Sequence, residues 1–396
     1  MYISYNGLGE PLVHSQVLPY LAGLVAAGHE IFLLTYERRG AGASYDEQQH
    51  RAAADLAKIG VRWRALTYHR WPSFTATLYD VLRGFASAVT AIRRDRVAAI
   101  HARSYVPAVI GWWARRLFGV RFVFDMRGLM ADEYVDAGNW KAAGSLYRLT
   151  KSTERRMIAA ADEVVVLTHR VKAHLVEAFS EIPDLSARTT VVPCCVDDSR
   201  FALPAEPRSG EGVRLVYVGS VGTWYLLDEM LDFFAAGAST APGSSFLWLN
   251  QHDHAVIRAA AAKRGLPPEV IQIAAVRPDE VPARLSGAHV GVSFIKPTFS
   301  KRASSPTKFA EYLAAGLPVV TNTGVGDLDD IVRKHRIGIV VQSLTPDGYR
   351  RAWRELAELR RDPGLALRCR RVAEEEFSVR VGVALYQAVY ARLEKA

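Results

Sequence analysis

Cysteine is scarce in this 396-residue sequence: it occurs three times, and Cys194 and Cys195 are adjacent. Thiols in this number and spacing form neither a disulfide framework nor the paired ligands of a zinc site, so we expect a reducing compartment. The sequence also lacks any run of about 20 apolar residues, the length that spans a bilayer. It begins with a strand-like segment at Tyr2, without the basic and apolar regions of a signal peptide. These absences predict a cytoplasmic protein without a membrane-spanning helix.

Acidic residues are fewer than basic ones, with 41 Asp and Glu against 50 Lys and Arg, which gives a formal net charge of +9. This excess indicates an acidic partner, such as a nucleotide, a lipid diphosphate or an anionic lipid surface. The basic aromatic motifs of known nucleic-acid readers are missing, so we expect no nucleic-acid partner. Hydrophobic residues at 49% and charged residues at 23% are ordinary for a globular α/β protein.

Short β-branched and aromatic segments alternate with amphipathic ones, which predicts an α/β fold with parallel sheets. The first predicted strands are 2–5, 30–36, 61–67, 97–101, 121–125, 163–167 and 189–192. The predicted helices between them are 15–27, 74–94, 105–117, 146–160 and 170–179. A Pro-, Glu- and Gly-rich passage at 203–212 is typical of a linker, and a second series of predicted strands follows it at 213–218, 245–250, 270–274, 289–295, 318–321 and 337–341. The sequence therefore predicts two domains of similar architecture.

The segment 304–327 has the pattern of a helix start that faces an anion. Ser305 suits the N-cap of a helix, and Pro306 suits the first helical position, where its missing N–H has no cost. The free N–H groups and partial positive charge of a helix N-terminus favour phosphate. Lys308 lies in that first turn, and Glu311, one turn later, is placed to accept hydrogen bonds from sugar hydroxyls. An ordinary strand–helix unit with a capped helix explains the same pattern, and this alternative stays open.

The same segment resembles the donor-binding segment of family 4 glycosyltransferases, retaining enzymes with two facing Rossmann-like domains (the GT-B architecture). The run from Glu311 to Val320, EYLAAGLPVV, matches the family's Glu followed by Ala-x-Ala-x-Gly-x-Pro-Val-Val or a close variant of it. The second acid of the family pattern, eight residues earlier, is Ala303 here. The resemblance covers nearly the whole chain. It implies an acceptor-binding domain at 1–195, a donor-binding domain at 196–376 and a C-terminal helix at 377–396 that packs back on the first domain.

For the donor, the resemblance implies a binding site in the second domain. Its expected residues are Gly219, Gly222, Thr223, Arg277, Ser304, Ser305, Thr307, Lys308 and Glu311. Ser220 stands where the family has an arginine, and no lysine follows it until Lys263. We therefore expect Lys308 to carry the charge of the diphosphate, with Lys296, Lys301 and Arg302 as secondary candidates. Asp327 and Asp329 match the metal-binding D-x-D pattern in form, but we interpret them as acidic residues at a helix start and expect no metal site.

For the acceptor, the resemblance points to the glycine loop that follows the first predicted strand and precedes a helix expected near Ser15. This loop is not G-x-G-x-x-G, and no acidic residue stands in the dinucleotide position at the end of the second predicted strand, which argues against NAD. A tight strand–helix turn without a ligand remains an alternative. The expected acceptor-binding residues are Gly7, Gly9, Glu10, His101 and Arg103.

Asp125 and Arg127 lie two residues apart at the end of a predicted strand, where ligands meet open α/β sheets. The resemblance implies that they take part in catalysis together with Lys308. A neighbouring cation favours the ionised carboxylate, so Asp125 is expected to stay charged. A purely structural ion pair at the strand end is the alternative.

The segment 93–127 contains eight arginines against two aspartates, together with Trp112, Trp113 and Phe118. Cationic and aromatic side chains in one segment are typical of proteins that bind anionic membrane interfaces. The sequence therefore predicts reversible attachment to the inner face of the cell membrane. The alternative is that the tryptophans belong to the core.

Together, these features predict a retaining, metal-independent, hexosyltransferase-like enzyme without a cofactor. It is expected to move a sugar from a nucleoside diphosphate sugar to a hydroxyl of a lipid-linked or other glycan acceptor, in the biosynthesis of a cell-surface polysaccharide. Two other functions stay open: a nucleotide-sugar epimerase or hydrolase of the same fold, and a non-catalytic nucleotide-sugar-binding partner of a biosynthetic complex. Ala303 and Ser220, which replace residues of the family pattern, favour the last of these.

Overall fold

The computed structural model describes the chain except for residues 39, 41–42, 72, 204–211 and 396. The chain forms two compact domains: the first comprises Met1–Pro193 and Gly382–Ala396, and the second comprises Cys194–Val381. The division therefore lies at Pro193 and inside the last helix, a few residues from the boundaries that the sequence predicts. The predicted linker 203–212 lies, except for its two ends, outside the described residues.

The first domain is built on a seven-stranded sheet with the order β3-β2-β1-β4-β5-β6-β7, in which all neighbouring strands are parallel. Its strands are β1 (Tyr2–Ser4), β2 (Ile31–Glu37), β3 (Val61–Thr67), β4 (Ala99–Arg103), β5 (Arg121–Asp125), β6 (Glu163–Val166) and β7 (Thr189–Val191). The central strands are buried on both faces, as in sheets covered by helices on either side. β4 begins and ends two residues later than predicted, so it includes Arg103.

The helices of the first domain are α1 (Pro11–Gln16), α2 (Leu18–Ala26), α3 (Ala43–Lys58), α4 (Ser73–Arg94), α5 (Tyr105–Phe118), α6 (Met130–Asp136), α7 (Ser145–Ala160) and α8 (His169–Ala178). The predicted start of the first helix near Ser15 is wrong, because α1 already begins at Pro11. It is also interrupted at Val17, just before Pro19, whose ring cannot donate to the preceding turn. α3 and α6 have no counterpart among the predicted helices.

The second domain contains a six-stranded parallel sheet with the order β10-β9-β8-β11-β12-β13. Its strands are β8 (Arg214–Val218), β9 (Ser245–Leu249), β10 (Ile271–Ala274), β11 (Val290–Ser293), β12 (Val319–Asn322) and β13 (Gly338–Val341). Its helices are η1 (Asp198–Arg200), α9 (Leu227–Ala238), α10 (His254–Ala262), α11 (Val281–Ser286), η2 (Phe299–Ala303), α12 (Thr307–Ala314), α13 (Leu328–His335), α14 (Pro346–Leu359) and α15 (Leu365–Glu376).

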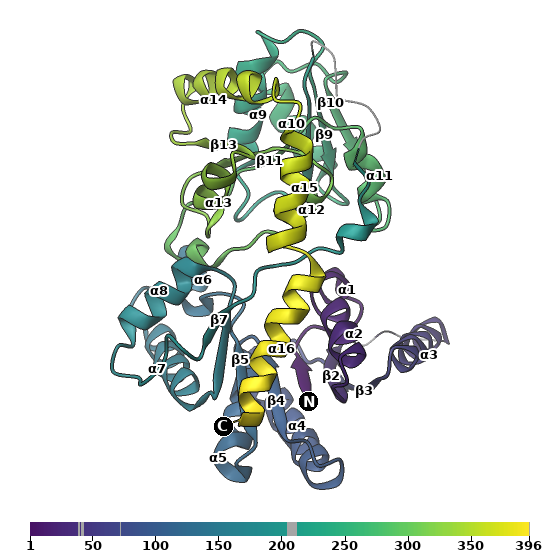
Figure 1. The fold of residues 1–396 in the computed structure, drawn as a ribbon, viewed down its shortest axis with the longest axis vertical. Helices are drawn as coiled ribbons and strands as arrows, with labels where there is room; N and C mark the ends of the chain where they lie inside the picture. Colours follow the sequence, from purple (N-terminus) through teal and green to yellow (C-terminus); the bar gives the residue numbers. More distant parts are fainter. Residues whose placement is uncertain (39, 41–42, 72, 204–211, 396) are drawn as a thin grey trace. The chain divides into compact units, whose positions relative to one another are not determined.

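Helices cover both faces of this second sheet: α12 packs with α15, and α9 packs with α14 (Figure 1). The α9–α14 side is rich in aromatic residues. Trp353 donates to the carbonyl oxygen of Phe233 at 2.7 Å and stacks on its ring. Gly237 makes this packing possible, because a Cβ atom there would collide with the indole of Trp353.

The last helix, α16 (Val379–Lys395), belongs to the first domain from Gly382 onward. Tyr386, Tyr390 and Arg392 on this helix all bond to residues of the first sheet. The predicted α/β fold, with two Rossmann-like domains and a C-terminal helix that returns to the first, is confirmed. Within the part of the chain that the structure describes, no helix has the length and apolarity needed to cross a bilayer.

Candidate functional site

The predicted donor segment, residues 304–327, follows η2 and forms α12 and β12. α12 begins at Thr307, and Pro306 rather than Ser305 occupies the N-cap position, without a side-chain cap. The predicted N-cap role of Ser305 is therefore wrong: its Oγ instead accepts a hydrogen bond from the backbone N–H of Cys194 at 3.0 Å. Ser304 follows η2 and donates its N–H to the carbonyl oxygen of Lys301. The turn is thus held by backbone contacts, which leaves the start of α12 without a side-chain acceptor.

Lys308, in the first turn of α12, is only 7% exposed. Its Nζ donates to the hydroxyl of Tyr217 at 3.2 Å and lies 3.6 Å from the centre of the Tyr225 ring. A Cβ atom at position 219 would lie 3.2 Å from this amine, so Gly219 leaves room for it beside the loop. No carboxylate among the described residues forms an ion pair with Lys308. A buried cation held by aromatic rings and lacking an acidic partner is the chemistry of an anion-binding site.

Burial lowers the pKa of Lys308 to about 7, although the nearby Glu311 opposes this shift. Glu311 is half-buried, and burial raises the pKa of its carboxyl while Lys308 and Arg200 lower it. Arg200 also influences Asp279 and donates to the carbonyl oxygen of Pro278 at 2.9 Å. Arg200 therefore links Glu311 to the loop that contains Arg277. The sequence reasoning did not find Arg200, Tyr217 or Tyr225, since no local motif marks them.

The glycine loop after β8 has the backbone conformations that its glycines predict: φ is 120° at Gly219, 98° at Gly222 and 48° at Thr223. Two of its N–H groups are already occupied, however. Gly219 donates to the carbonyl oxygen of Leu249, and Val221 donates to Asp253. The loop therefore offers fewer free amides to a diphosphate than its glycine content predicts.

Other predicted donor-side residues lie at the surface or in structural contacts. Arg277 is exposed and pairs with Asp279 at 3.0 Å. Lys301 is buried, with its Nζ 3.7 Å from the centre of the Trp224 ring. Asp329 accepts hydrogen bonds from Thr323 Oγ1 at 2.6 Å and from the backbone N–H of Gly324, so it closes the turn before α13.

In the first domain, the predicted residues at the ends of β4 and β5 come together around Asp125. The carboxylate of Asp125 is fully buried and accepts a hydrogen bond from the hydroxyl of Tyr386 at 3.0 Å. His101 Nε2 lies 3.4 Å away, and guanidinium nitrogens of Arg103 and Arg127 lie 3.8 and 3.7 Å away. Asp125 therefore holds a cluster of basic groups rather than facing a substrate itself.

Burial would raise the pKa of Asp125, but Arg127, His101 and Arg103 together lower it to about 2, so the predicted ionised state agrees with the geometry. Burial lowers the pKa of His101, whose Nδ1 is also bonded to the hydroxyl of Tyr390 at 2.9 Å. The expected contact of His101 and Arg103 with an acceptor is not supported, because both side chains are buried in this cluster. Tyr386 and Tyr390 escaped the sequence reasoning because they lie more than 250 residues from Asp125.

The glycine loop after β1 binds the carboxylate of Glu37, a residue that the predicted second strand, 30–36, did not include. β2 extends to Glu37, and its carboxylate accepts the N–H of Leu8 at 2.9 and 3.0 Å and the hydroxyl of Thr35 at 2.5 Å. The prediction that no acidic residue stands at the end of the second strand is therefore wrong. Gly7 is needed for this contact, because a Cβ atom there would collide with the Glu37 carboxylate. Glu10 pairs with Arg38 at 2.8 Å on the outside of the loop.

The basic segment 93–127 is partly used for packing between α4 and α5. The rings of Trp113 and Phe118 lie 5.7 and 6.4 Å from that of Phe85, and Arg93 lies over Phe118. Trp112 and Trp113 are half-buried. Exposed apolar side chains lie on α4 before this segment, at Phe74, Leu78 and Leu82, and within the segment at Leu117 of α5.

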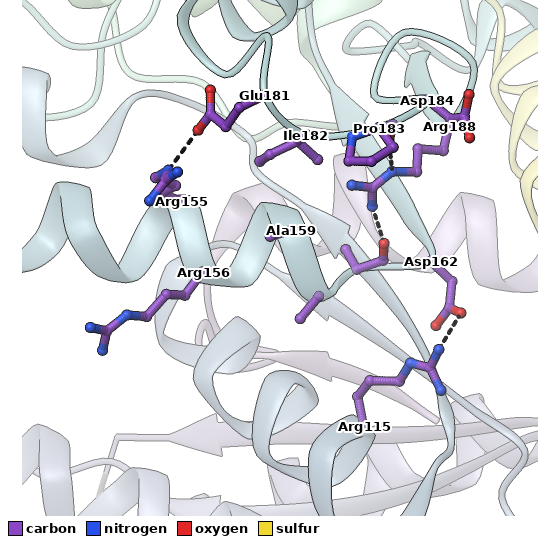
Figure 2. A pocket seen from close by; sticks show the side chains of 12 residues that line it. Arg115, Arg155, Arg156, Ala159, Asp162, Glu181, Ile182, Pro183, Asp184 and Arg188 are labelled. Atoms are coloured by element: carbon purple, nitrogen blue, oxygen red, sulfur yellow. Dashed lines mark hydrogen bonds and ion pairs between the residues drawn. The ribbon is translucent and has the colours of Figure 1, made fainter.

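A cavity of about 620 Å³ in the first domain shares only Arg115 with the groups described so far. Figure 2 shows two ion pairs at its wall: Arg155 with Glu181, and Arg115 with Asp162. Arg188 donates to the carbonyl oxygens of Ile158 and Ala161. This cavity therefore has the contacts of a structural junction between α5, α7 and the segment 181–188.

Two family models match the chain. Residues 13–195 match the glycosyl transferase 4-like domain, and residues 244–346 match the glucosyltransferase 3-like, C-terminal domain. No curated protein matches the sequence.

Solved structures match over the full length of the chain. Sucrose-phosphate synthase from Thermosynechococcus elongatus has a TM-score of 0.73 at 15% identity, over 100% of this chain and 98% of that one. HepE from Anabaena in complex with UDP-glucose has a TM-score of 0.68 at 13% identity, over 100% and 99%. WaaG, a glycosyltransferase involved in lipopolysaccharide biosynthesis, has a TM-score of 0.64 at 15% identity, over 98% of each chain. At these identities, the structures establish the shared fold.

Proposed function

We propose that this chain is a GT-B glycosyltransferase with a first domain of the glycosyl transferase 4-like type, and that it transfers a sugar from a nucleoside diphosphate sugar to a hydroxyl of an acceptor. The observation that carries this proposal is the buried amine of Lys308, which lies beside Gly219 and has no carboxylate partner among the described residues. The diphosphate of the donor provides the missing negative charge. Glu311, one turn later, binds the ribose hydroxyls.

In the reaction that we propose, the bond between the sugar C1 and the diphosphate oxygen breaks while the acceptor oxygen attacks the same face. The acceptor proton passes to the departing diphosphate, and the configuration at C1 is retained. The protein acts by positioning the reactants and by stabilising charge on the leaving group. Lys308, in the second domain, supplies the positive charge for this stabilisation. We also assign a catalytic role to Arg127, which Asp125 holds at the end of β5.

We propose a hexose as the transferred sugar, metal-independent transfer, and an acceptor that is a lipid-linked or other glycan of a cell-surface polysaccharide. The acceptor class is supported by the structural similarity to WaaG, a glycosyltransferase involved in the biosynthesis of lipopolysaccharide. The donor class is supported by HepE, which binds UDP-glucose.

We further propose that the protein works on the cytoplasmic face of the membrane. The exposed residues Phe74, Leu78 and Leu82 follow each other at intervals of four on α4, so they form one apolar stripe. Arg93 and Arg94 end the same helix and are exposed. Apolar side chains and cations on one helix fit an anionic lipid surface. This stripe replaces the half-buried Trp112 and Trp113 as the proposed contact.

Thermal unfolding in the presence of UDP, ADP and GDP tests the donor site, because a ligand that binds only the folded state raises its stability by mass action. We expect one of the three to stabilise the protein in the presence of EDTA, since no metal is required. Stabilisation by none of them would contradict the proposal.

Turnover of the matching sugar nucleotide separates the alternatives. Release of free sugar without any acceptor would indicate a hydrolase, and an altered sugar on the same nucleotide would indicate an epimerase. Binding without turnover under any acceptor would indicate a non-catalytic partner of a complex.

A further inference from the structure

A buried aspartate in the first domain orients a partly exposed histidine that no part of the proposed reaction uses. Asp80, on α4, is fully buried. Its carboxylate accepts the backbone N–H of His69 at 3.0 Å, the hydroxyl of Tyr5 at 3.0 Å and the ring Nδ1 of His69 at 2.6 Å. Three donors on one carboxylate fix the His69 ring firmly in place.

The contact with Asp80 determines which ring nitrogen of His69 is free to accept. A carboxylate only accepts hydrogen bonds, so Nδ1 carries the hydrogen and Nε2 of the neutral ring carries the lone pair. Nε2 forms no hydrogen bond with any residue that the structure describes. The side chain is 31% exposed, whereas His101 is buried with both ring nitrogens engaged. His69 therefore presents an oriented hydrogen-bond acceptor at the surface.

The position of His69 in the sheet is that of a ligand-binding residue. His69 follows β3, Tyr5 follows β1, and Glu37 ends β2, so all three lie at the C-terminal edge of the parallel sheet. This is the edge at which open α/β sheets bind their ligands. The glycine loop after β1 lies at the same edge.

Aromatic side chains lie beside the oriented nitrogen. The ring of Tyr79 is 5.1 Å from that of His69, edge to face, and Tyr79 is 52% exposed. Tyr68 packs against Tyr5 with its ring centre 5.4 Å away. The surface thus combines an exposed apolar ring with a single polar acceptor, the combination by which binding sites recognise small organic ligands.

We propose that His69 binds the acceptor sugar: its Nε2 accepts a hydrogen bond from a sugar hydroxyl, and Tyr79 packs against the apolar C–H face of the same ring. Asp80 is the positioning residue that sets the direction of His69. This inference rests on the proposed function and adds the acceptor-binding residues, since His101 and Arg103 are buried. A hydroxyl fits because it can donate to the lone pair; a fully ionised phosphate has no hydrogen to donate and would face the charge of Asp80 behind the ring.

Binding of simple glycosides to the full chain tests this site without knowledge of the natural acceptor. The probes are the octyl glycosides of glucose, galactose and mannose, and the measurement is saturation-transfer NMR with titration. We expect wild-type protein to bind at least one of them. His69→Ala should weaken that binding by about five- to tenfold, the loss that follows from removing one hydrogen bond. His69→Gln should restore part of it, because its amide oxygen can accept in place of Nε2.

Two further variants separate binding from folding. Tyr79→Ala changes an exposed residue and should also weaken glycoside binding, whereas His50→Ala changes an exposed histidine of α3 and should not. Stabilisation by UDP, ADP or GDP should be the same in all variants, so failure of the donor site is recognised separately. Wild-type affinity in both His69→Ala and Tyr79→Ala, or no binding of any glycoside to wild type, would overturn the proposal.

Discussion

Lys308 has lost part of its preference for the charged state, because its amine lies between tyrosine rings instead of water. A diphosphate next to this amine would restore the charge. The same diphosphate gains negative charge as the sugar leaves, so the interaction becomes stronger in the transition state.

Replacement of Lys308 by methionine should therefore lower kcat more than it weakens donor binding. We expect kcat to fall by about a hundredfold, the effect of removing one donor at a developing anion. Steady-state kinetics with the cognate donor and acceptor provide the measurement, and Lys263→Met, an exposed lysine at the end of α10, is the matched control. A near-normal kcat would transfer the role to Lys301, Arg302 or an arginine of the first domain.

The depressed pKa of Lys308 also predicts a pH dependence of stability. Between about pH 7 and pH 10, the unfolded chain keeps the lysine proton while the folded protein has lost it, so stability rises with pH through this window. Below pH 7 the folded protein holds a buried charged amine, which lowers the free energy of unfolding by its full amount. Lys308→Met removes this contribution and should be more stable than wild type at about pH 6, by about 1–3 kcal/mol. Denaturant unfolding at several pH values measures the difference in free energy of unfolding between the variant and the wild type. This difference should become smaller as pH rises. A difference that does not change with pH would contradict the lowered pKa of Lys308.

Glu311 is the second residue whose role can be isolated. Its carboxylate lies one turn after Lys308 on α12, which suits a contact with the ribose next to the diphosphate. Glu311→Ala should weaken nucleotide binding by about 1–3 kcal/mol, the range for hydrogen bonds to a charged group. Calorimetric titration with the nucleoside diphosphate that stabilises the wild type measures this loss, with the exposed Glu269→Ala as control. Unchanged affinity would remove Glu311 from the donor site.

At the scale of elements, one of the contacts that hold α16 to the first domain is an ion pair of Arg392. Arg392 bonds to both oxygens of Glu163, at 2.7 and 2.6 Å, and to Thr190 at 2.6 Å. Glu163 is buried, so its charge needs this partner.

Arg392→Met should lower the free energy of unfolding by about 1–3 kcal/mol, because it leaves the carboxylate of Glu163 without its cation. Arg380→Met changes an exposed arginine on the same helix and should have little effect. Chemical denaturation of both variants gives the comparison. Equal stability of the two variants would show that apolar packing alone holds α16.

At the scale of the whole molecule, the stripe of Phe74, Leu78 and Leu82 should give salt-sensitive binding to anionic vesicles. The double variant Leu78→Ser/Leu82→Ser should lower this binding by about tenfold, since each leucine loses apolar area that the lipid would bury. Flotation with phosphatidylglycerol and phosphatidylcholine vesicles measures the effect, and Val256→Ser, an exposed apolar residue of the second domain, serves as control. No preference for the anionic vesicles would contradict the membrane proposal.

The sequence by itself determined the order and type of nearly all strands, since a buried parallel strand needs a continuous apolar run and such runs are visible locally. It also placed Lys308 and Glu311 on one helix, because residues three apart share a helical face. It did not determine which polar atoms are occupied, because hydrogen-bond partners come from distant parts of the chain. Only the tertiary structure showed the hydrogen bonds of Ser305 with Cys194, of Glu37 with the first glycine loop and of His101 with Tyr390. The same long-range packing left the ring of His69 fixed by Asp80 and its second nitrogen open to a ligand.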